Sequence, residues 1–239
     1  MTQKRTNGKH TEEFSRRSHS YESSNIIQKK AAKKLIEKID FDARSILDLG
    51  CGSGAVFQNI SWPVERFVGI DKAANMCKLH PNSSHIHIIQ ADFEDPSLYT
   101  KLDRFSPFDL IVSSSALQWA HDLPALFEKI SILGNHVAFA IFCEGTFRTI
   151  RQTAGISTFL PNIDNLERLL NRYFDCRFER WEERLYFPDN LSKFRYIKRS
   201  GVSGGERRLG YRETKRLIRE YPLEYLEFEI LFAWGEIRR

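Results

Sequence analysis

Residues 46–54 read ILDLGCGSG, an apolar run that contains one acid and ends in three glycines within five positions. A glycine-rich turn after a buried strand lets a ligand approach the backbone closely, because no Cβ lies in the way. A helix that begins after the turn would add free N–H groups. A tight turn alone needs a single glycine. The pattern therefore predicts an α/β sheet, a helix after the turn and a nucleotide-like ligand across Gly50–Gly54.

Short apolar runs recur through the first 145 residues, with helix-capable stretches between most of them. The runs are SILDL (45–49), RFVGI (66–70), HIHII (85–89), FDLIVS (108–113) and HVAFAIF (136–142). Buried runs that alternate with helices indicate βαβ units and a parallel sheet. An amphipathic helix is expected over 22–39, before these runs, because apolar residues recur there at every fourth position.

The pattern changes after residue 145. NIDNLERLLNRYF (162–174) is helical, whereas CRFERWEERLYF (176–187) and LEYLEFEILFAWGEI (223–237) alternate like strands. The stretch between these two runs, 191–221, predicts a helix, a glycine-containing loop and a second helix. No linker separates two domains. We therefore expect one domain over 1–239, built from three parts: an N-terminal helical cover (1–40), a cofactor-binding core (41–145), and a lid with closing strands (146–239).

Composition narrows the class of protein. Hydrophobic residues make up 41% of the chain and aromatic residues 13%, which is typical of a folded domain. No apolar run approaches the roughly 20 residues that span a bilayer, and the first 25 residues lack the apolar segment of a secretory signal. The four cysteines are scattered, which predicts a cytoplasmic protein with neither a disulfide framework nor a metal site.

Charge is unevenly distributed along the chain. The net charge of +5 comprises +5 over residues 1–44, −5 over 45–144 and +5 over 145–239. Basic flanks around an acidic core are either solvated surface or a docking surface for an acidic partner.

The glycine motif leaves the ligand open, because GCGSGA (50–55) also fits the dinucleotide fingerprint G-x-G-x-x-G/A. A phosphate loop is excluded, since no GK[ST] follows. The extra Gly54, the strand acid Asp48 and the acids of QADFED (90–95) argue against a pyrophosphate, which carboxylates would repel. A cofactor with an ammonium group and a ribose would suit them. Asp71, 21 residues after Gly50, is placed to bind ribose hydroxyls.

Four motifs together resemble the class I S-adenosylmethionine-dependent methyltransferases: ILDLGCGSG, VGID, QADFED and FDLIVSSSALQWAHD. SSSALQW is similar to the SNLALQW stretch of the malonyl-acyl-carrier-protein O-methyltransferases of biotin synthesis, although Ser114 replaces the usual Asn. The stretches FSRRSHSYESSNIIQKKAAKKL, FLP, FRYIKRSGV and LEFEILFAWG also resemble that family. The resemblance implies a Rossmann-like, mostly parallel seven-stranded sheet with helices on both faces and a small helical lid.

The resemblance also implies the cofactor, S-adenosylmethionine, and the residues around it. The loop backbone would hold the methionine part, Asp48 would orient the loop and the ammonium group, and Asp71 would bind the ribose. The remaining cofactor residues would be Gly50, Cys51, Gly52 and Gly54 in the loop, Lys72, Asp92 and Phe93 beside the adenine, Ser113 at the fourth strand, and Tyr21 over the cofactor.

The substrate implied by the resemblance is malonyl-acyl-carrier protein. Its free carboxyl is already ionised near pH 7, so no catalytic base is expected and positioning should carry the reaction. His121 is expected at the surface or in a cap. The substrate-facing candidates are Gln118 and Trp119, with Tyr21 over the cofactor and Arg148 and Lys198 as possible cations for the carboxylate. An acidic carrier protein could dock on a basic rim formed by Lys30, Lys34, Arg195, Arg199, Arg207, Arg208, Arg212 and Arg216.

Three other interpretations remain open from the sequence. A methyltransferase for small, aconitate-like acids would share the fold and much of the core pattern. A nucleic-acid methyltransferase is suggested by the basic pI of about 9.0, but the chain has neither an NPPY-type motif nor interleaved aromatic and basic residues. A cofactor-binding scaffold without activity is the third interpretation. The choice between a carrier-protein and a coenzyme A thioester is also open.

Overall fold

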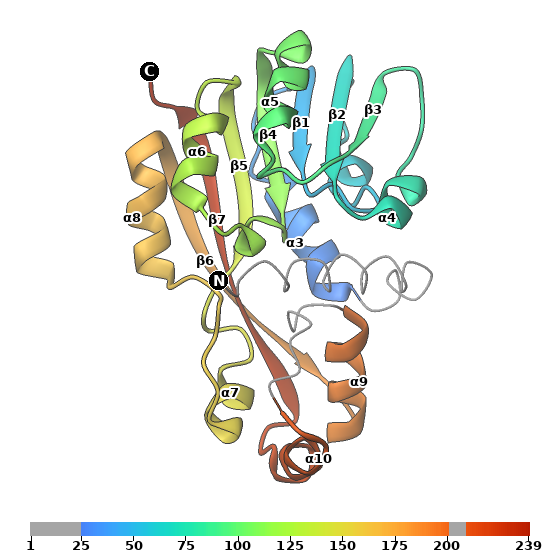
Figure 1. Cartoon of the computed structure of the whole chain (residues 1–239), viewed down its shortest axis with the longest axis vertical. Helices are drawn as coiled ribbons and strands as arrows, with labels where there is room; N and C mark the ends of the chain where they lie inside the picture. Colours follow the sequence, from blue (N-terminus) through green and yellow to red (C-terminus); the bar gives the residue numbers. More distant parts are fainter. Residues whose placement is uncertain (1–24, 201–208) are drawn as a thin grey trace.

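The computed structural model describes residues 25–200 and 209–239. Tyr21, Arg207 and Arg208, for which the sequence predicts roles, lie outside the described residues. Seven strands form one sheet in the order β3-β2-β1-β4-β5-β7-β6 (Figure 1). They are β1 (Ser45–Leu49), β2 (Arg66–Asp71), β3 (Ile86–Gln90), β4 (Phe108–Ser114), β5 (Gly134–Phe142), β6 (Phe174–Tyr186) and β7 (Tyr225–Ile237).

The first five strands are parallel, and β7 then pairs antiparallel with both β5 and β6. The predicted apolar runs all become strands. β1 is buried along its whole length, as expected for a central strand covered on both faces. The predicted Rossmann-like, mostly parallel seven-stranded sheet is confirmed.

Helices cover both faces of the sheet. On one face, α3 (Ile26–Ile36) packs its buried residues Ile27, Ala31 and Leu35 against strand residues such as Val112. On the other face, apolar residues of three helices pack in a second core with Leu47 of β1: α5 (Pro96–Leu102), α6 (Leu123–Ile130) and α8 (Ile163–Tyr173). No helix of the described ranges is long and apolar enough to cross a membrane.

The prediction of a helix directly after the glycine turn is wrong. Between β1 and β2 the described chain forms only the one-turn 3-10 helix η1 (Phe57–Asn59), and the longer helix α4 (Ala74–Leu79) follows β2 instead. Ile60 is already extended, with φ −73° and ψ 124°, and Pro63 disfavours helical geometry in the residue before it. Ligand-binding N–H groups on this side must therefore come from the loop itself.

The elements after β5 build a lid at the end of the molecule toward which the parallel strands run (Figure 1). The lid contains α7 (Arg148–Ala154), α9 (Asn190–Ser200) and α10 (Tyr211–Glu220), beside the long β6–β7 pair. Buried Lys193 fixes α9, because its ammonium group donates to the Leu223 carbonyl at 2.6 Å and to Asn190 Oδ1 at 2.7 Å. The predicted pair of helices in 191–221 is thus confirmed.

Candidate active site

The loop after β1 has a backbone shape that needs glycine. Gly50, Gly52 and Gly54 have φ values of 81°, 53° and 89°, in the left-handed region. The N–H groups of Gly50 and Cys51 both donate to the Ile70 carbonyl, at 2.7 and 3.0 Å, which holds the loop against the end of β2. A Cβ on Gly50 would lie 2.2 Å from the Ala116 Cβ. The loop therefore directly abuts the turn that follows β4.

Asp71, at the end of β2, braces this loop. Its carboxylate accepts hydrogen bonds from the N–H of Gly52 at 2.9 Å and from the N–H of Ala73 at 2.8 Å. Burial raises the pKa of Asp71, and these two hydrogen bonds oppose that rise. The sequence predicts ribose binding by this carboxylate but not its role in holding the loop. Each carboxylate oxygen keeps a second lone pair with which it can accept from a hydroxyl.

Asp48 lies in the middle of β1 with no exposed surface, and neither of its carboxylate oxygens has a partner. Burial raises its pKa well above the usual value, and the negative charge of Asp71 raises it further. A buried carboxylate without a partner is costly unless a ligand supplies one. Its position on the strand that leads into the glycine loop fits the ammonium group of an amino-acid cofactor.

The turn after β3 contains the residues predicted to hold the base. Lys72 forms an ion pair with Asp92 at 3.6 Å, and Asp92 Oδ1 accepts from the Glu94 N–H at 3.0 Å. The Tyr99 hydroxyl donates to the Phe93 carbonyl at 2.8 Å. The structure thus brings Lys72, Asp92 and Phe93 together at the carboxyl edge of the sheet. Their contact with an adenine remains a prediction.

Glu94 ties the β3 turn to the turn after β4, a role that the sequence did not reveal. Its carboxylate accepts from the N–H groups of His121 at 2.8 Å and Asp122 at 3.1 Å, and it also binds His121 Nδ1 at 2.8 Å. The His121 side chain is 56% exposed. His121 therefore has the surface position that the sequence predicts.

The end of β4 concentrates polar atoms that lack partners. Eight buried side-chain nitrogen or oxygen atoms of the described residues have no hydrogen bond, and five of them belong to Asp48, Ser114, Ser115 and Gln118. Gln118 is buried and uses its Nε2 to donate to the Ser115 carbonyl at 2.8 Å. Ser113 differs from them, because its fully buried hydroxyl donates to the Leu49 carbonyl at 2.6 Å and braces β1.

An aromatic pair joins the turn after β4 to the segment before α8. The Trp119 and Phe159 rings stack with centroids 4.9 Å apart and planes 24° apart, and Phe159 is 45% exposed. The sequence points to Trp119 but misses Phe159, which is 40 positions away in the chain. The only signal that could have found it is the FLP stretch that carries part of the family resemblance.

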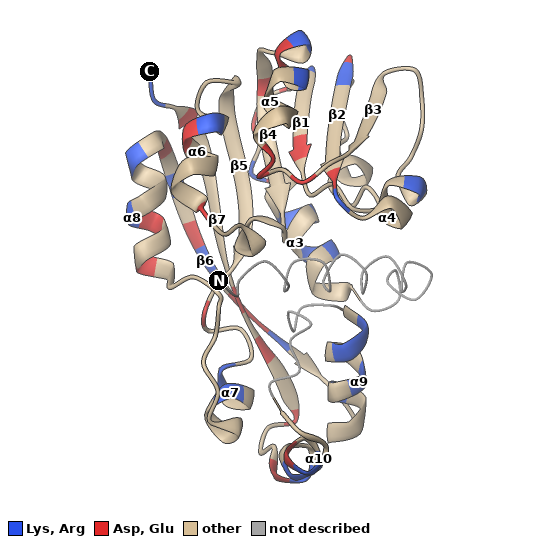
Figure 2. Ribbon diagram, viewed as in Figure 1, with Lys and Arg blue, Asp and Glu red and all other residues tan. Residues whose placement is uncertain are grey.

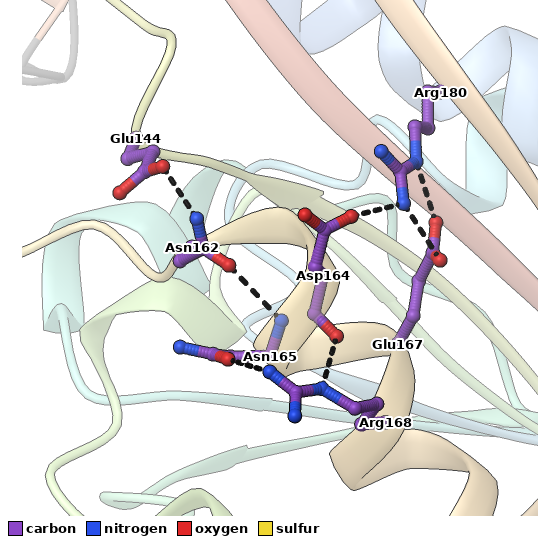
Figure 3. A network of polar contacts seen from close by, with 7 residues as sticks. All are labelled: Glu144, Asn162, Asp164, Asn165, Glu167, Arg168 and Arg180. Carbon is purple, nitrogen blue, oxygen red and sulfur yellow. Dashed lines mark hydrogen bonds and ion pairs between the residues drawn. The ribbon is translucent and has the colours of Figure 1, made fainter.

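The segment with Phe159 is tied to the end of β5. Glu144 donates its N–H to the Pro161 carbonyl at 2.9 Å, and its side chain accepts from Asn162 Nδ2 at 2.5 Å. Asn162 caps α8. Asp164 and Glu167 of this helix accept hydrogen bonds from Arg180 of β6 (Figure 3). This polar network fixes the position of the aromatic pair relative to the sheet.

Neither of the two predicted cations forms a hydrogen bond with these unpartnered atoms. Arg148 is 57% exposed and pairs with Glu227 at 3.7 Å, and Lys198 is exposed on α9. Arg151, which the sequence did not single out, donates to the backbone carbonyls of Glu144 and Thr146. Its guanidinium group holds the turn after β5.

Some of the basic residues predicted to form one rim are engaged in ion pairs or in a cation–π contact. Lys30 pairs with Glu183 of β6 at 2.5 Å, and Lys34 lies 5.2 Å over the Trp181 ring. In the lid, Arg216 is 3.8 Å from Glu220. Arg195 and Arg199 on α9 and Arg212 on α10 are also exposed. Figure 2 shows basic residues on α9 and α10, with acidic residues also on α10.

Comparisons with known proteins agree with this geometry. The family model described as "Methyltransferase domain" matches residues 47–133. The YcgJ protein of Bacillus subtilis has the same fold, with a TM-score of 0.62 and 14% identity over 88% of this chain and 98% of that one. The chain therefore contains a methyltransferase domain. The unpartnered Asp48 beside the glycine loop fits the ammonium group of S-adenosylmethionine, the cofactor that the sequence predicts.

Two curated relatives extend the comparison. This chain is 32% identical to a malonyl-[acyl-carrier protein] O-methyltransferase of Acetivibrio thermocellus over 145 residues, a match that covers 56% of this chain and 49% of the relative. It thus spans about half the length of that relative. An enzyme of the same name from Calditerrivibrio nitroreducens is 26% identical over 227 residues, 87% of this chain and 84% of the relative.

Proposed function

We propose that this methyltransferase methylates the free carboxylate of malonyl-acyl-carrier protein, giving its methyl ester in an early step of biotin synthesis. The observation that carries the proposal is the match to the Calditerrivibrio nitroreducens enzyme, which extends beyond the methyltransferase domain to 87% of this chain. That match includes most of the residues after β5, which form the lid and the substrate side of the site.

The proposed cofactor contacts follow from the loop and strand ends. Asp48 accepts from the ammonium group, the loop backbone from Gly50 to Gly54 holds the methionine part, and Asp71 accepts from the ribose hydroxyls. Lys72, Asp92 and Phe93 flank the adenine. When bound, S-adenosylmethionine supplies an electrophilic methyl group, to which a carboxylate oxygen bonds while the sulfur keeps the electron pair of the broken C–S bond.

No proton has to move in this reaction, because the malonyl carboxyl is ionised near pH 7. The protein's task is to hold the nucleophile and the methyl group in line at a separation of about 3–3.5 Å. This agrees with the position of His121, which is half exposed and bound to Glu94. The Trp119–Phe159 pair serves as a wall that keeps the acyl end of the substrate over the cofactor.

The carrier protein is the proposed partner, and the lid is its proposed docking surface. Arg195 and Arg199 lie exposed on α9, and Arg212 lies exposed on α10. Exposed arginines of this kind attract an acidic protein and mainly speed its encounter with the enzyme.

One assay tests the proposed function against its alternatives. Labelled S-adenosylmethionine is offered with malonyl-acyl-carrier protein, malonyl-coenzyme A, free tricarboxylates or tRNA. The proposal requires the largest kcat/KM for the malonyl-carrier protein and a base-labile methyl ester as product. Preference for an aconitate-like acid or for tRNA would overturn the proposed substrate while leaving the methyltransferase fold as it is. Labelling of none of these substrates would favour a scaffold without activity.

A further inference from the structure

Two consecutive serines lie at the carboxyl end of β4, beside β5. Ser114 pairs with Ala140 in the sheet register, and the N–H of Ser115 donates to the Ala140 carbonyl at 2.8 Å. Ser113, just before them, directs its hydroxyl to the Leu49 carbonyl of β1. Since successive strand residues point to opposite sides, Ser114 projects away from that brace.

The hydroxyls of Ser114 and Ser115 are buried and have no hydrogen-bond partner. Burying a hydroxyl without a partner is costly, so such groups in a site call for a ligand. Ser115 also has a φ of 63°, a left-handed conformation that a serine adopts at a cost. Ala116, the next residue, is the one that abuts Gly50 of the cofactor loop. The unpartnered hydroxyls therefore lie beside the cofactor loop.

The chemistry of the neighbouring groups indicates which ligand group the hydroxyls receive. Asp48 and the Gln118 Oε1 atom are unpartnered acceptors and suit the cationic end of the cofactor. The hydroxyls can act as donors and suit an anion. The cations after β5, Arg148 and Arg151, are engaged with Glu227 and with backbone carbonyls, respectively.

Neutral donors suit a carboxylate nucleophile better than a cation does. Methylation removes the negative charge of the carboxylate, so an ion pair with arginine or lysine would weaken as the reaction proceeds. Such a pair would stabilise the bound substrate more than the transition state, which does not accelerate the reaction. Hydroxyl donors hold the carboxylate in place and lose less when its charge disappears.

We propose that Ser114 and Ser115 are the receptor for the reacting carboxylate, which they bind through two neutral hydroxyl donors in place of Arg148 or Lys198. The inference rests on the proposed function and deepens it. It makes the serine pair the feature that selects a free acid over its ester.

The test measures binding to the full-length protein saturated with S-adenosylhomocysteine, so that no reaction occurs. The probes are malonyl-pantetheine and its methyl ester, titrated by calorimetry into the wild type, Ser114→Ala and Ser115→Gly. Ser115→Gly removes the hydroxyl and relieves the left-handed strain, so the fold should be retained. Ser131→Ala is the matched control, because the Ser131 hydroxyl is satisfied by the Glu128 carbonyl on α6.

Each serine variant should weaken binding of the acid about tenfold or more, as expected for a hydrogen bond to a charged group, and binding of the ester only a few-fold. S-adenosylhomocysteine affinity and the Ser131→Ala variant should match the wild type. If the serine substitutions weaken binding of the acid and of the ester equally, the inference is overturned. It is also overturned if the variants lose as much affinity for S-adenosylhomocysteine as for the acid, because the hydroxyls would then bind the cofactor. If the wild type binds the acid and both serine variants bind it equally well, only this inference is overturned. A wild type that binds neither probe would overturn the proposed function as well.

Discussion

Asp71 accepts a hydrogen bond from the N–H of Gly52 at 2.9 Å, which couples the last residue of β2 to the middle of the cofactor loop. The same carboxylate accepts from the N–H of Ala73 at 2.8 Å. The residue proposed to bind the ribose is therefore also the residue that shapes the loop. A substitution at this position changes both the contact and the pre-organisation of the site.

Asp71→Ala should weaken S-adenosylmethionine binding by at least about 1.5–3 kcal/mol, the scale of a hydrogen bond to a charged group. Asp71→Asn should lose less affinity for S-adenosylmethionine, because its amide oxygen can still accept a hydrogen bond from the Gly52 N–H or from a hydroxyl. Calorimetry with both variants, supported by circular dichroism to check the fold, measures the difference. Equal affinity of the wild type and Asp71→Ala would reject the ribose assignment, and binding of NADH by the wild type would reject the cofactor.

Substitutions of two loop glycines should differ in their effects on the stability of the fold and on cofactor binding. Gly50→Ala should lower the free energy of unfolding by several kcal/mol, because its Cβ would lie 2.2 Å from the Ala116 Cβ. Gly52→Ala meets only the Met76 Cε at 3.7 Å and should cost only about 1–2 kcal/mol for its left-handed φ.

Gly155→Ala is the matched control for Gly52→Ala, since Gly155 has a φ of 66° and no atom within 4 Å of the added Cβ. Both variants should unfold at similar denaturant concentrations, but only Gly52→Ala should impair S-adenosylhomocysteine binding. If the two variants bind it equally well, the cofactor does not approach the loop at Gly52.

Asp48 should make the ligand-free protein less stable as the pH rises. Burial raises the pKa of Asp48 well above its unfolded value of about 3.9. Between these two values the folded state binds a proton that the unfolded state has lost, so raising the pH through this window lowers the free energy of unfolding. Asp48→Asn removes this proton linkage and the buried charge. It should stabilise the ligand-free protein at pH 7 by on the order of 1–3 kcal/mol.

The same substitution should weaken the cofactor complex, because an ammonium group needs the ionised carboxylate. Affinity of the wild type for S-adenosylhomocysteine should therefore increase with pH through the Asp48 titration, and Asp48→Asn should remove that part of the increase. Denaturation curves at several pH values, each with and without S-adenosylhomocysteine, give both quantities. A variant that is less stable than the wild type and binds equally well would contradict the assignment of Asp48.

The sequence predicts those parts of the molecule that depend on local pattern. The strands at 45–49 and 136–142 follow from their apolar runs, and the lid helices follow from periodicity. The helix after the glycine loop was predicted wrongly, because the short, proline-terminated segment before β2 leaves room for only one turn. Glu94 and Phe159 were missed for another reason. Their partners, His121 and Trp119, are 27 and 40 positions away, and only the fold brings them together.

His121 and Trp119 should differ in their effect on turnover. His121→Ala removes a half-exposed ring bound to Glu94 and should lower kcat less than tenfold. Trp119→Ala removes the stacking partner of Phe159 and should lower kcat more than His121→Ala does, because the rate depends on how the substrate is positioned. Steady-state kinetics with malonyl-carrier protein compare the two. A decrease in kcat of about 10²–10⁴-fold for His121→Ala would show general base catalysis and refute the proposed mechanism.

Docking of the carrier protein should depend on the charge of the lid. Arg195→Glu combined with Arg199→Glu reverses two exposed charges on α9 and should raise KM for malonyl-carrier protein while leaving cofactor affinity unchanged. Lys101→Glu on α5 is the control, since it is an exposed lysine outside the lid and should have little effect. Added salt should lower kcat/KM for the carrier protein more steeply than for malonyl-coenzyme A, because surface charges are screened over about 8 Å at physiological ionic strength. If both substrates show the same salt dependence and the α9 reversals have no effect, the basic lid is solvated surface and the carrier protein docks elsewhere.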